Sequence, residues 1–510
     1  MARVLLGFWV TAANHPSHVA LIEPGGAEIT YGELLGRVNR LSNALVSQGI
    51  SAGGHVAVLS WNRAEILVLA LAVAQIGATF TPLDAHGTAP EIAGILQDRP
   101  PLALFVEAKT AAVAHAAAEQ AQLDSPTVNF DAVTDGVTLA DWTTDMSAAA
   151  PAVRLAGGAV LYTSGTSGKP KGVVRELDAV EPERALDSFA LLLTRFGIDP
   201  AEHQGKGVQL VTSPLYHAAP LHIALLALHI GHTIVIMDRF VEEYALELVE
   251  RHRVTWTHVV PTMMRRWMRM DADKRASYDV SSLEWFIHAA APCPAELKRE
   301  VIDWLGPIVY EYYASTEIGG AAISTEEWLA HPGSVGKPWP GADIKILNAA
   351  AEQVAAGEVG NVYLRLARAF TYHNDPAKTA ESTDGDYFTV GDLGWLDHDG
   401  YLYIADRRSD LILVGGANVY PAEVESALLR HDEVLDVAVI GIPHSDRGQV
   451  VHAFVQPRDG INERELITSL EAWAQHELGS QKRPLSYEIV SSIPRSEMGK
   501  LMRRKLRPAP

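Results

Sequence analysis

Apolar and polar positions along the chain alternate between two periods. Apolar residues recur at helical spacing over residues 31–48, form a short run over 55–60, and return to helical spacing over 65–77. Short apolar runs separated by helical segments are typical of an α/β fold. The other strands expected before residue 320 are 159–162, 208–212, 233–237, 255–260, 285–289 and 308–312, and the helices between them include 240–252 and 294–305.

The pattern changes in the last third of the chain. Residues 332–341 form a turn-rich crossing, and short strands with Gly and Asp punctuation follow as far as Tyr403. From Ser409 onward the order is strand, helix, two strands, helix and strand, with helices over 421–430 and 463–476. The sequence therefore predicts an N-terminal domain over 1–408 and a small α+β C-terminal domain over 409–510.

Composition and charge narrow the range of possible functions. The 510 residues, 48% hydrophobic and 20% charged, fit a soluble globular protein of more than one domain. A net charge of -20 argues against nucleic acid as a general partner. Cys293 is the only cysteine, which excludes an intramolecular disulfide and favours a cytoplasmic location. The longest apolar stretch, 66–74, is shorter than the roughly 18 residues that span a bilayer, so we expect no integral membrane segment.

The most informative segment is 161–173, LYTSGTSGKPKGV, where a predicted strand enters a glycine-rich loop. Glycines let backbone N–H groups approach an anion, hydroxyls add donors and lysines supply charge. The spacing is not that of a Walker A loop, and Pro170 favours a mobile loop over a rigid helix start. A Gly/Ser-rich surface linker is the alternative. The predicted phosphate-binding residues are Thr163, Ser164, Gly165, Thr166, Ser167, Gly168, Lys169 and Lys171.

This loop resembles the phosphate-loop signature of the adenylate-forming superfamily, which includes acyl-CoA synthetases, adenylation domains and luciferases. Later segments resemble the family's other motifs in order: YASTE at 313–317, PGSVGKP at 332–338, GD at 391–392, DRRSD at 406–410, GGAN at 415–418, and PR and GK at 494–495 and 499–500. The resemblance covers residues 31–506. It implies a large N-terminal domain of several subdomains, with mixed sheets sandwiched by helices, joined by a hinge near Ser409 to the small domain.

The resemblance also assigns roles to single residues. It implies that Thr316 contacts the α-phosphate of ATP and that Glu317 binds Mg²⁺, for which a carboxylate oxygen is a suitable hard ligand. Asp392 is expected to accept hydrogen bonds from the ribose hydroxyls, with Arg407 completing the site. The residues expected beside adenine are Ala291, Pro292, Tyr312 and Tyr313, the last offering a flat face for stacking.

The acyl and thiol sites are implied in the same way. Lys500 is placed between the acyl carboxylate and the α-phosphate, where a cation offsets the repulsion of two anions. By its local sequence alone it would be a surface lysine in a basic tail. His217 is placed beside the acyl site and the thiol channel, although a lone histidine after a strand is more often structural. Gly415 and Gly416 are placed beside the incoming pantetheine.

The implied activity is that of an ATP-dependent acyl-CoA synthetase. A carboxylic acid and ATP give acyl-AMP and pyrophosphate with Mg²⁺, and coenzyme A then displaces AMP. The expected substrate is a fatty or bulky apolar acid, with a steroid-like acid as one candidate, and the pocket residues are expected from 217–221, 262–264, 289–293 and 318–320. The alternatives are a free-standing adenylation enzyme that loads a carrier protein and a catalytically inactive nucleotide-binding homologue. A homodimer is left open.

Three positions depart from the family pattern. Ala314 stands at the glycine of the YGxTE motif, and 289–292 reads AAAP where the family has a GGAP-like segment. Ser409 stands at the hinge, where Lys or Asp is usual. We expect these changes to leave the turn and the adenine approach in place and to alter only the kinetics of domain rotation.

Overall fold

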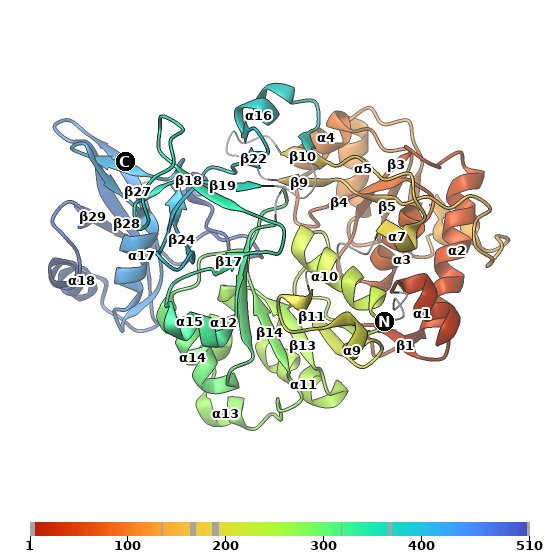
Figure 1. The fold of residues 1–510 in the computed structure, drawn as a ribbon, viewed down its shortest axis with the longest axis horizontal. Helices are drawn as coiled ribbons and strands as arrows, with labels where there is room; N and C mark the ends of the chain where they lie inside the picture. The colour runs from red at the N-terminus through yellow and green to blue at the C-terminus, as the bar shows by residue number, and fades with distance from the viewer. Residues whose placement is uncertain are drawn as a thin grey trace.

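The computed structural model describes residues 6–133, 136–163, 170–185, 193–317, 319–365 and 370–506. Figure 1 shows the segment after residue 409, here called the C-terminal unit, at one end of the molecule and the first parallel sheet at the other. Among the described residues no helix is long and apolar enough to cross a membrane. The cytoplasmic location stays a prediction.

The first sheet has strand order β7-β6-β5-β3-β4-β8, and its pairs are parallel. Its first long helix, α2, begins with a capping box in which the side chains of Thr30 and Glu33 each accept a hydrogen bond from the other's backbone N–H. The strands are β3 (His55–Leu59), β4 (Thr79–Leu83), β5 (Leu104–Val106), β6 (Thr127–Asn129), β7 (Val137–Thr138) and β8 (Gly158–Ala159). The helices are α2 (Tyr31–Ser47), α3 (Ala64–Ala74), α4 (Ala89–Asp98), α5 (Ala111–Gln120) and α6 (Leu139–Thr143).

The second sheet has order β17-β16-β15-β14-β13-β11-β12-β1-β2, parallel from β15 to β1 and antiparallel at both edges. Its strands are β1 (Val19–Ile22), β2 (Glu28–Thr30), β11 (Val208–Val211), β12 (Thr233–Ile236), β13 (Trp256–Val259), β14 (Trp285–His288), β15 (Val309–Tyr313), β16 (Ala321–Ile323) and β17 (Lys337–Pro338). The helices along this part of the chain are α1 (Phe8–Asn14), α7 (Pro182–Ala185), α9 (Pro200–His203), α10 (Ala218–His229), α11 (Glu242–His252), α12 (Pro261–Arg269), α13 (Ala272–Ala276), α14 (Ala295–Leu305) and α15 (Thr325–Ala330).

One apolar core joins these two sheets. It contains most of α3 together with Phe80 of the first sheet and Val211, Trp256 and Ile287 of the second. Helix α3 is therefore buried along nearly its whole length, which explains why its sequence is apolar all round instead of amphipathic. The other face of the second sheet packs on α11, α12 and α14 to form a separate core.

Two smaller sheets follow. One has order β20-β10-β9, and the other has order β21-β22-β19-β23-β24 with β18 beside β19. Their strands are β9 (Leu161–Thr163), β10 (Lys171–Val174), β20 (Thr371–Tyr372), β18 (Ile344–Leu347), β19 (Gly360–Arg365), β21 (Thr383–Asp384), β22 (Tyr387–Phe388), β23 (Asp392–Leu396) and β24 (Leu402–Arg407), and the chain between β20 and β21 forms helix α16 (Pro376–Glu381).

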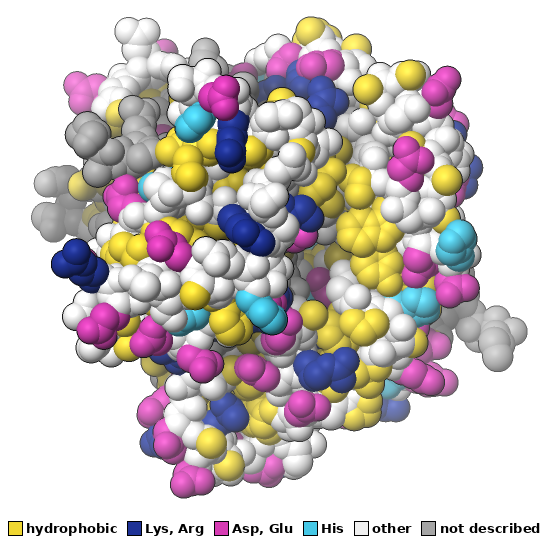
Figure 2. Space-filling view, turned by 90° about the vertical axis from the view of Figure 1, so that its left-hand side faces the viewer, with side chains coloured by type: hydrophobic (Ala, Val, Ile, Leu, Met, Phe, Trp, Pro, Cys, Tyr) yellow, Lys and Arg dark blue, Asp and Glu magenta, His cyan; other side chains and the backbone are white. Residues whose placement is uncertain are grey.

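The C-terminal unit has a sheet of its own, ordered β26-β25-β28-β27 with β29 beside β28, and a core that includes Val437, Val455 and Leu470. Its elements are β25 (Ile412–Val414), β26 (Ala417–Val419), α17 (Pro421–Leu429), β27 (Val434–His444), β28 (Gly448–Pro457), α18 (Glu463–Glu477), β29 (Ser486–Ile489) and the 3-10 turn Arg503–Lys505. On the face that carries this unit, the described basic and acidic side chains are interspersed (Figure 2). That face therefore lacks, among its described residues, the uniform positive field that phosphate backbones require.

The predicted α/β fold, with a large N-terminal part and a small C-terminal one, is confirmed, and most predicted elements agree with the structure to within a few residues. The exact domain boundary at 408–409 stays a prediction. Two predicted strands are each a pair of strands. The strand expected between Ser409 and the helix at 421–430 is the hairpin of β25 and β26. The strand expected at 159–162 is β8 in the first sheet and β9 in a different sheet. The apolar run is continuous because the chain crosses from one buried sheet directly into another. Helix α14 begins one residue later than the predicted helix 294–305, because Pro294 is its N-cap residue.

Candidate active site

Three predicted nucleotide-binding residues meet where β15, β23 and β24 come together. Asp392 begins β23 and lies opposite Arg407, the last residue of β24, in antiparallel register. Arg407 Nε lies 3.3 Å from Oδ1 of Asp392, and the Tyr313 hydroxyl donates to Oδ2 at 2.6 Å. Burial, followed by the charge of Asp392, raises the pKa of Tyr313, so its hydroxyl remains a donor. The structure thus assembles the predicted ribose corner around one buried carboxylate.

Thr316 and Glu317 follow β15 and are held by two residues that the motifs did not indicate. The Tyr372 hydroxyl donates to Oε1 of Glu317 at 3.0 Å, and Arg175 Nη2 donates to the backbone carbonyls of Thr316 and Glu317 at 2.9 and 2.8 Å. Glu317 is 7% exposed. Its carboxylate is therefore fixed in orientation. Arg175 follows the lysine-rich loop closely in sequence, and that proximity is the signal that could have found it.

Lys500 reaches this site from the far end of the chain. The net effect of its surroundings is to lower its pKa, chiefly through burial and then through the charge of Arg407, while Asp392 and Glu317 act in the opposite direction. Because the residue as a whole is exposed to solvent, water screens part of the effect of burial. Folding therefore brings this lysine to the ribose corner and Glu317.

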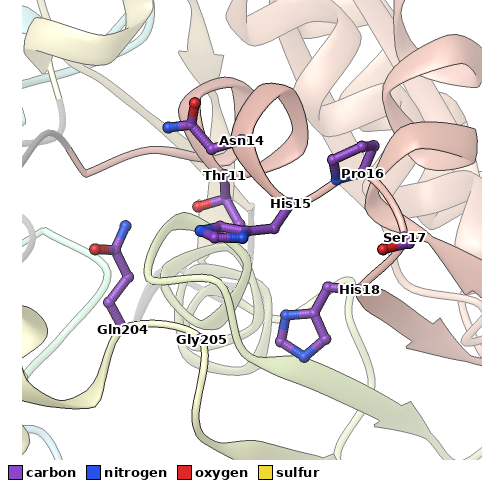
Figure 3. A pocket seen from close by; sticks show the side chains of 8 residues that line it. All are labelled: Thr11, Asn14, His15, Pro16, Ser17, His18, Gln204 and Gly205. Carbon is purple, nitrogen blue, oxygen red and sulfur yellow. The ribbon is translucent and has the colours of Figure 1, made fainter.

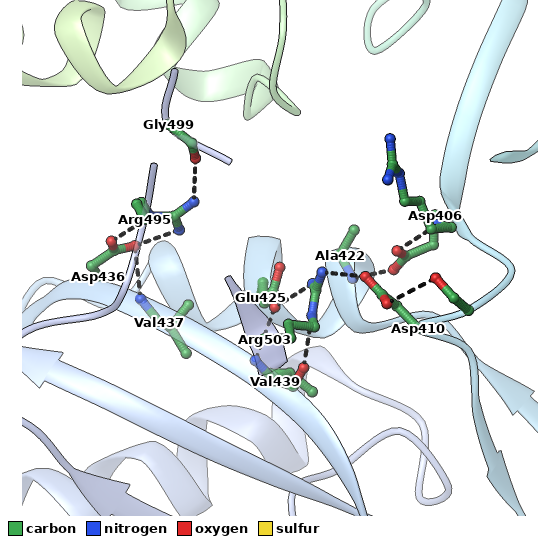
Figure 4. A network of polar contacts seen from close by, with 12 residues as sticks. Asp406, Asp410, Ala422, Glu425, Asp436, Val437, Val439, Arg495, Gly499 and Arg503 are labelled. Atoms are coloured by element: carbon green, nitrogen blue, oxygen red, sulfur yellow. Dashed lines mark hydrogen bonds and ion pairs between the residues drawn. The ribbon is translucent and has the colours of Figure 1, made fainter. Parts of the chain in front are cut away.

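The turn that carries Lys500 is built by short-range hydrogen bonds. Ser496 N–H donates to the carbonyl of Lys500 at 2.9 Å, and Gly499 N–H donates to that of Ser496 at 2.8 Å. Arg495 Nη1 donates to the carbonyl of Gly499 at 3.0 Å while its other nitrogens bind Asp436 of β27 (Figure 4). The turn is thus anchored to the sheet of the C-terminal unit.

Thr163 and Lys171, the two described ends of the predicted phosphate loop, face each other across the β9–β10 pair. Lys171 Nζ lies 3.2 Å from the carboxylate of Asp375 and 5.4 Å from the centre of the Tyr372 ring. Because Tyr372 also binds Glu317, Lys171 lies at the same site as the YASTE motif. The residues that lie outside the described part of the chain are Ser164, Gly165, Thr166, Ser167, Gly168 and Lys169 of the loop and Ile318 of the expected acyl pocket.

His217 is the N-cap residue of α10. Burial, the largest effect, lowers its pKa to about 4, with Asp84 opposing the shift and Lys500 and His86 adding to it. The imidazole is therefore neutral at pH 7, and its electrostatic neighbours place it near Lys500. A neutral ring suits the predicted border of an acyl site better than a charged one would.

The predicted adenine residues divide between two faces of one strand. Tyr312 and Tyr313 are consecutive in β15, so their side chains point to opposite faces of the sheet. Tyr312 is buried in the core between the sheets, where its hydroxyl lies 3.1 Å from Nε2 of His258. The structure therefore does not bring the Tyr312 side chain to Asp392. Ala291 and Pro292 follow Ala290, whose φ of 76° is a conformation that glycine adopts more readily.

Gly415 and Gly416 form the two-residue turn between β25 and β26, with φ values of 57° and 87°. Two positive φ angles in succession define the tight hairpin turn that favours glycine. Gly415 N–H donates to the carbonyl of Arg447, within the C-terminal unit, at 2.9 Å. Among the described residues after Ser409, Lys500 interacts electrostatically with Asp392 and Glu317, whereas the glycine pair carries no side-chain charge.

The junction at residues 406–410 is held by ion pairs and a helix cap (Figure 4). Asp406 accepts a hydrogen bond from Ala422 N–H at the start of α17 at 2.8 Å. Asp410 pairs with Arg503 at 2.9 Å, and Arg503 also binds Glu425 at 2.6 Å. Because Asp406 precedes Ser409 and Ala422 follows it, a rotation that begins at Ser409 must break the bond between them.

A separate cavity of about 400 Å³ lies where α1 leads into β1 (Figure 3). The predicted site residues lie elsewhere, and the lining of this cavity is mostly uncharged and polar. The lining residues are Thr11, Asn14, His15, Pro16, Ser17, His18, Gln204 and Gly205.

Comparison with known proteins identifies the family. The family model described as "AMP-binding enzyme" matches residues 8–370, and "AMP-binding enzyme C-terminal domain" matches 423–500. The chain is 31% identical to the fatty acid–acyl-carrier-protein ligase ScoC of Streptomyces coeruleorubidus, covering 97% of this chain and 94% of that one. It is 32% identical to a feruloyl-CoA synthase of an Amycolatopsis species, covering 98% of each.

A solved structure is also similar over the whole chain. It is o-succinylbenzoate CoA synthetase of Bacillus subtilis with its acyl-adenylate intermediate, at 25% identity and a TM-score of 0.84, covering 99% of this chain and 98% of that one. The chain therefore belongs to the AMP-binding enzyme family and is an ATP-dependent acid ligase of the adenylate-forming superfamily.

Proposed function

We propose that this chain is an acyl-CoA synthetase that forms an acyl-adenylate from a carboxylic acid and ATP and then transfers the acyl group to coenzyme A. The observation that carries the proposal is that Lys500 lies within electrostatic range of both Asp392 and Glu317. Formation of the adenylate brings a carboxylate against a phosphate, and a cation between them stabilises the charge that develops in the transition state. This arrangement is the one that the first half-reaction needs.

The residues around Lys500 divide the work of binding ATP. Asp392 would accept hydrogen bonds from the ribose hydroxyls, since Arg407 and Tyr313 hold its carboxylate in place. Thr316 would donate to the α-phosphate, and Lys171 with the loop before it would bind the leaving phosphates. These roles rest on side chains that fold into one site from separate segments of the chain.

Glu317 fits a magnesium site. Mg²⁺ is bound in proteins by one or two carboxylates together with substrate phosphates, and Glu317 is a buried carboxylate that Tyr372 orients. The ion would supply positive charge to the phosphates. Tyr372 would keep the Glu317 oxygens aimed at it.

For the thiol step, the C-terminal unit would pivot near Ser409, remove Lys500 and present the Gly415–Gly416 turn to the pantetheine arm. Two glycines without side chains suit a close approach of backbone to ligand. Coenzyme A is favoured as acceptor because a feruloyl-CoA synthase is similar over 98% of each chain. The similarity to an acyl-carrier-protein ligase keeps a carrier protein as the second candidate.

The acid is proposed to be fatty or bulky and largely apolar. Ala218, Ala219 and Ala289 pack with the core between the two sheets near His217, and small side chains leave room for a large substrate. The buried Tyr312–His258 pair adds polar atoms to this core. A panel of acids assayed with ATP, Mg²⁺ and coenzyme A would identify the class.

Replacing Lys500 with alanine tests the division of labour. Adenylate formation, measured as pyrophosphate release, should be nearly abolished in this variant. Thioester formation from a supplied acyl-adenylate should remain largely intact. Lys505→Ala removes the same charge from the exposed end of the same segment and should leave both rates unchanged. Equal loss of both half-reactions in Lys500→Ala would contradict the proposal.

Two further measurements test which thiol is the acceptor and whether the protein is catalytically active. Rates with coenzyme A and with an acyl carrier protein, compared in one assay, decide the acceptor. Absence of pyrophosphate release with every acid tested would instead favour a nucleotide-binding protein without catalysis.

A further inference from the structure

Lys500 belongs to a turn that contacts the N-terminal part of the molecule at the three consecutive residues before it. Glu497 reaches His86 and Tyr216, Met498 is 5% exposed and packs into the core on the outer face of the second sheet, and Gly499 lies against Thr262. Met498 and Gly499 contact the N-terminal part through apolar packing and shape. Glu497 does so through charge and hydrogen bonds.

The two partners of Glu497 are themselves fixed. Oε1 of Glu497 pairs with Nε2 of His86, and Oε2 accepts a hydrogen bond from the Tyr216 hydroxyl. The backbone N–H of His86 donates to Asp84 at 2.8 Å, and its ring packs edge-on against Trp61 with centroids 4.5 Å apart. Tyr216 is 7% exposed and precedes His217 directly. Glu497 therefore binds two preorganised groups on the proposed acyl side of the site.

We propose that Glu497 is a positioning residue for adenylate formation: by binding Tyr216 and His86 it holds the Lys500 turn against the N-terminal part of the molecule. The inference rests on the proposed role of Lys500 in the first half-reaction. Glu497 acts through Lys500 and has no role once the C-terminal unit has rotated for the thiol step. His86 lies in the loop after β4 and Tyr216 lies just before α10, so the contact exists only while the turn is docked.

The expected loss of adenylation rate in Glu497→Ala is moderate, because only one of the two partners of Glu497 is buried. The His86 and Glu497 side chains are 51% and 33% exposed, and ion pairs at such exposure contribute little. The bond from the buried Tyr216 to a carboxylate is stronger, as hydrogen bonds to charged groups are. We therefore expect Glu497→Ala to slow adenylate formation about tenfold, with Tyr216→Phe giving most of the same loss.

The test measures the two half-reactions separately in the full-length enzyme. Glu497→Ala should slow pyrophosphate release about tenfold and leave thioester formation from a supplied acyl-adenylate within about twofold of wild type. Glu497→Gln, which retains a neutral acceptor oxygen for Tyr216 but not the charge, should be slowed less than Glu497→Ala. Glu471→Ala, an exposed acid on α18, is the matched control and should change neither rate.

Two further results, the first independent of activity, distinguish positioning from general stability. Hydrogen exchange at residues 496–500 should accelerate in Glu497→Ala while the melting temperature stays close to that of wild type. The double variant with Tyr216→Phe should lose much less adenylation rate than the sum of the single losses, because both substitutions remove the hydrogen bond between Tyr216 and Glu497. Equal slowing of both half-reactions, full additivity, or an unchanged adenylation rate would overturn the inference. If the wild-type enzyme releases no pyrophosphate with any acid, the proposed function itself fails, and unchanged exchange at 496–500 in Glu497→Ala would still overturn the positioning role.

Discussion

Gly499→Ala probes the docking of the Lys500 turn by a steric change of one methyl group. Gly499 has a φ of +70°, and a Cβ added there would lie 2.8 Å from Cγ2 and 3.0 Å from Oγ1 of Thr262. Separations this short require one of the two segments to move. Thr262 is the second residue of α12, which is held by helix hydrogen bonds and by packing.

The free-energy cost of Gly499→Ala has two parts, one that applies whenever the turn is folded and one that applies only when it is docked. An alanine at positive φ costs roughly 1–2 kcal/mol, offset in part by about 0.5–1 kcal/mol because glycine loses more freedom on folding. That part applies whenever the turn is folded. Overpacking against Thr262 costs about 1–3 kcal/mol and applies only when the turn is docked. At about 1.4 kcal/mol per tenfold change, adenylate formation should fall roughly 5- to 150-fold.

The assay compares pyrophosphate release with thioester formation from a supplied acyl-adenylate. Thioester formation should change little, because the overlap is absent when the C-terminal unit has rotated. Thr262→Ala removes both nearest atoms and leaves Cβ at 3.5 Å, an ordinary contact distance. The double variant should therefore recover most of the adenylation rate relative to Thr262→Ala alone.

Two outcomes would refute this reasoning. If Gly499→Ala slows both half-reactions alike, the cost comes from strain in the turn and not from docking. If Thr262→Ala gives no rescue, the contact in the structure does not limit the adenylation state.

Three further predictions concern charged groups in and below the site. Asp392→Ala should weaken ATP binding about 10- to 100-fold, because it removes a charged acceptor; isothermal titration checks this, and an unchanged affinity would exclude Asp392 from the ribose site. Lys298→Met should lower the free energy of unfolding by about 3–5 kcal/mol in denaturant titrations, because it leaves the buried Glu311 without its cation, whose Nζ lies 2.7 Å from the carboxylate. Adding Glu311→Leu should recover much of this loss, and no recovery would mean that the loss comes from packing. Because burial and then Arg407 lower the pKa of Lys500, adenylate formation should decline with rising pH at values below 10.5, and Arg407→Gln should move that decline to higher pH; a decline at or above 10.5 in the wild-type enzyme would contradict the lowered pKa.

The sequence alone determined the class of fold and most of the chemistry. Periodicity located elements such as α2 and β11–β15 because a helix or strand buried on one or both faces must repeat its apolar residues at the period of its backbone. Motif order grouped Glu317, Asp392, Arg407 and Lys500 in one nucleotide site. In the structure, the first three lie around the fourth.

Only the tertiary structure decided which segments far apart in the chain contact each other. No local pattern marks Tyr372 as the partner of Glu317, because the two residues are brought together by sheet pairing and not by helical or strand period. The position of Arg175 soon after the lysine-rich loop hints at a role in the site, but its bonds to the backbone of Thr316 and Glu317 appear only in the fold. Strand alternation alone predicts that Tyr312 and its neighbour in β15 point to opposite faces of the sheet. Which face is buried between the sheets became clear only from the packed structure. The docking of Glu497 on the N-terminal part depends on how the C-terminal unit is oriented, and that orientation follows from the summed contacts of two folded surfaces, which no single segment encodes.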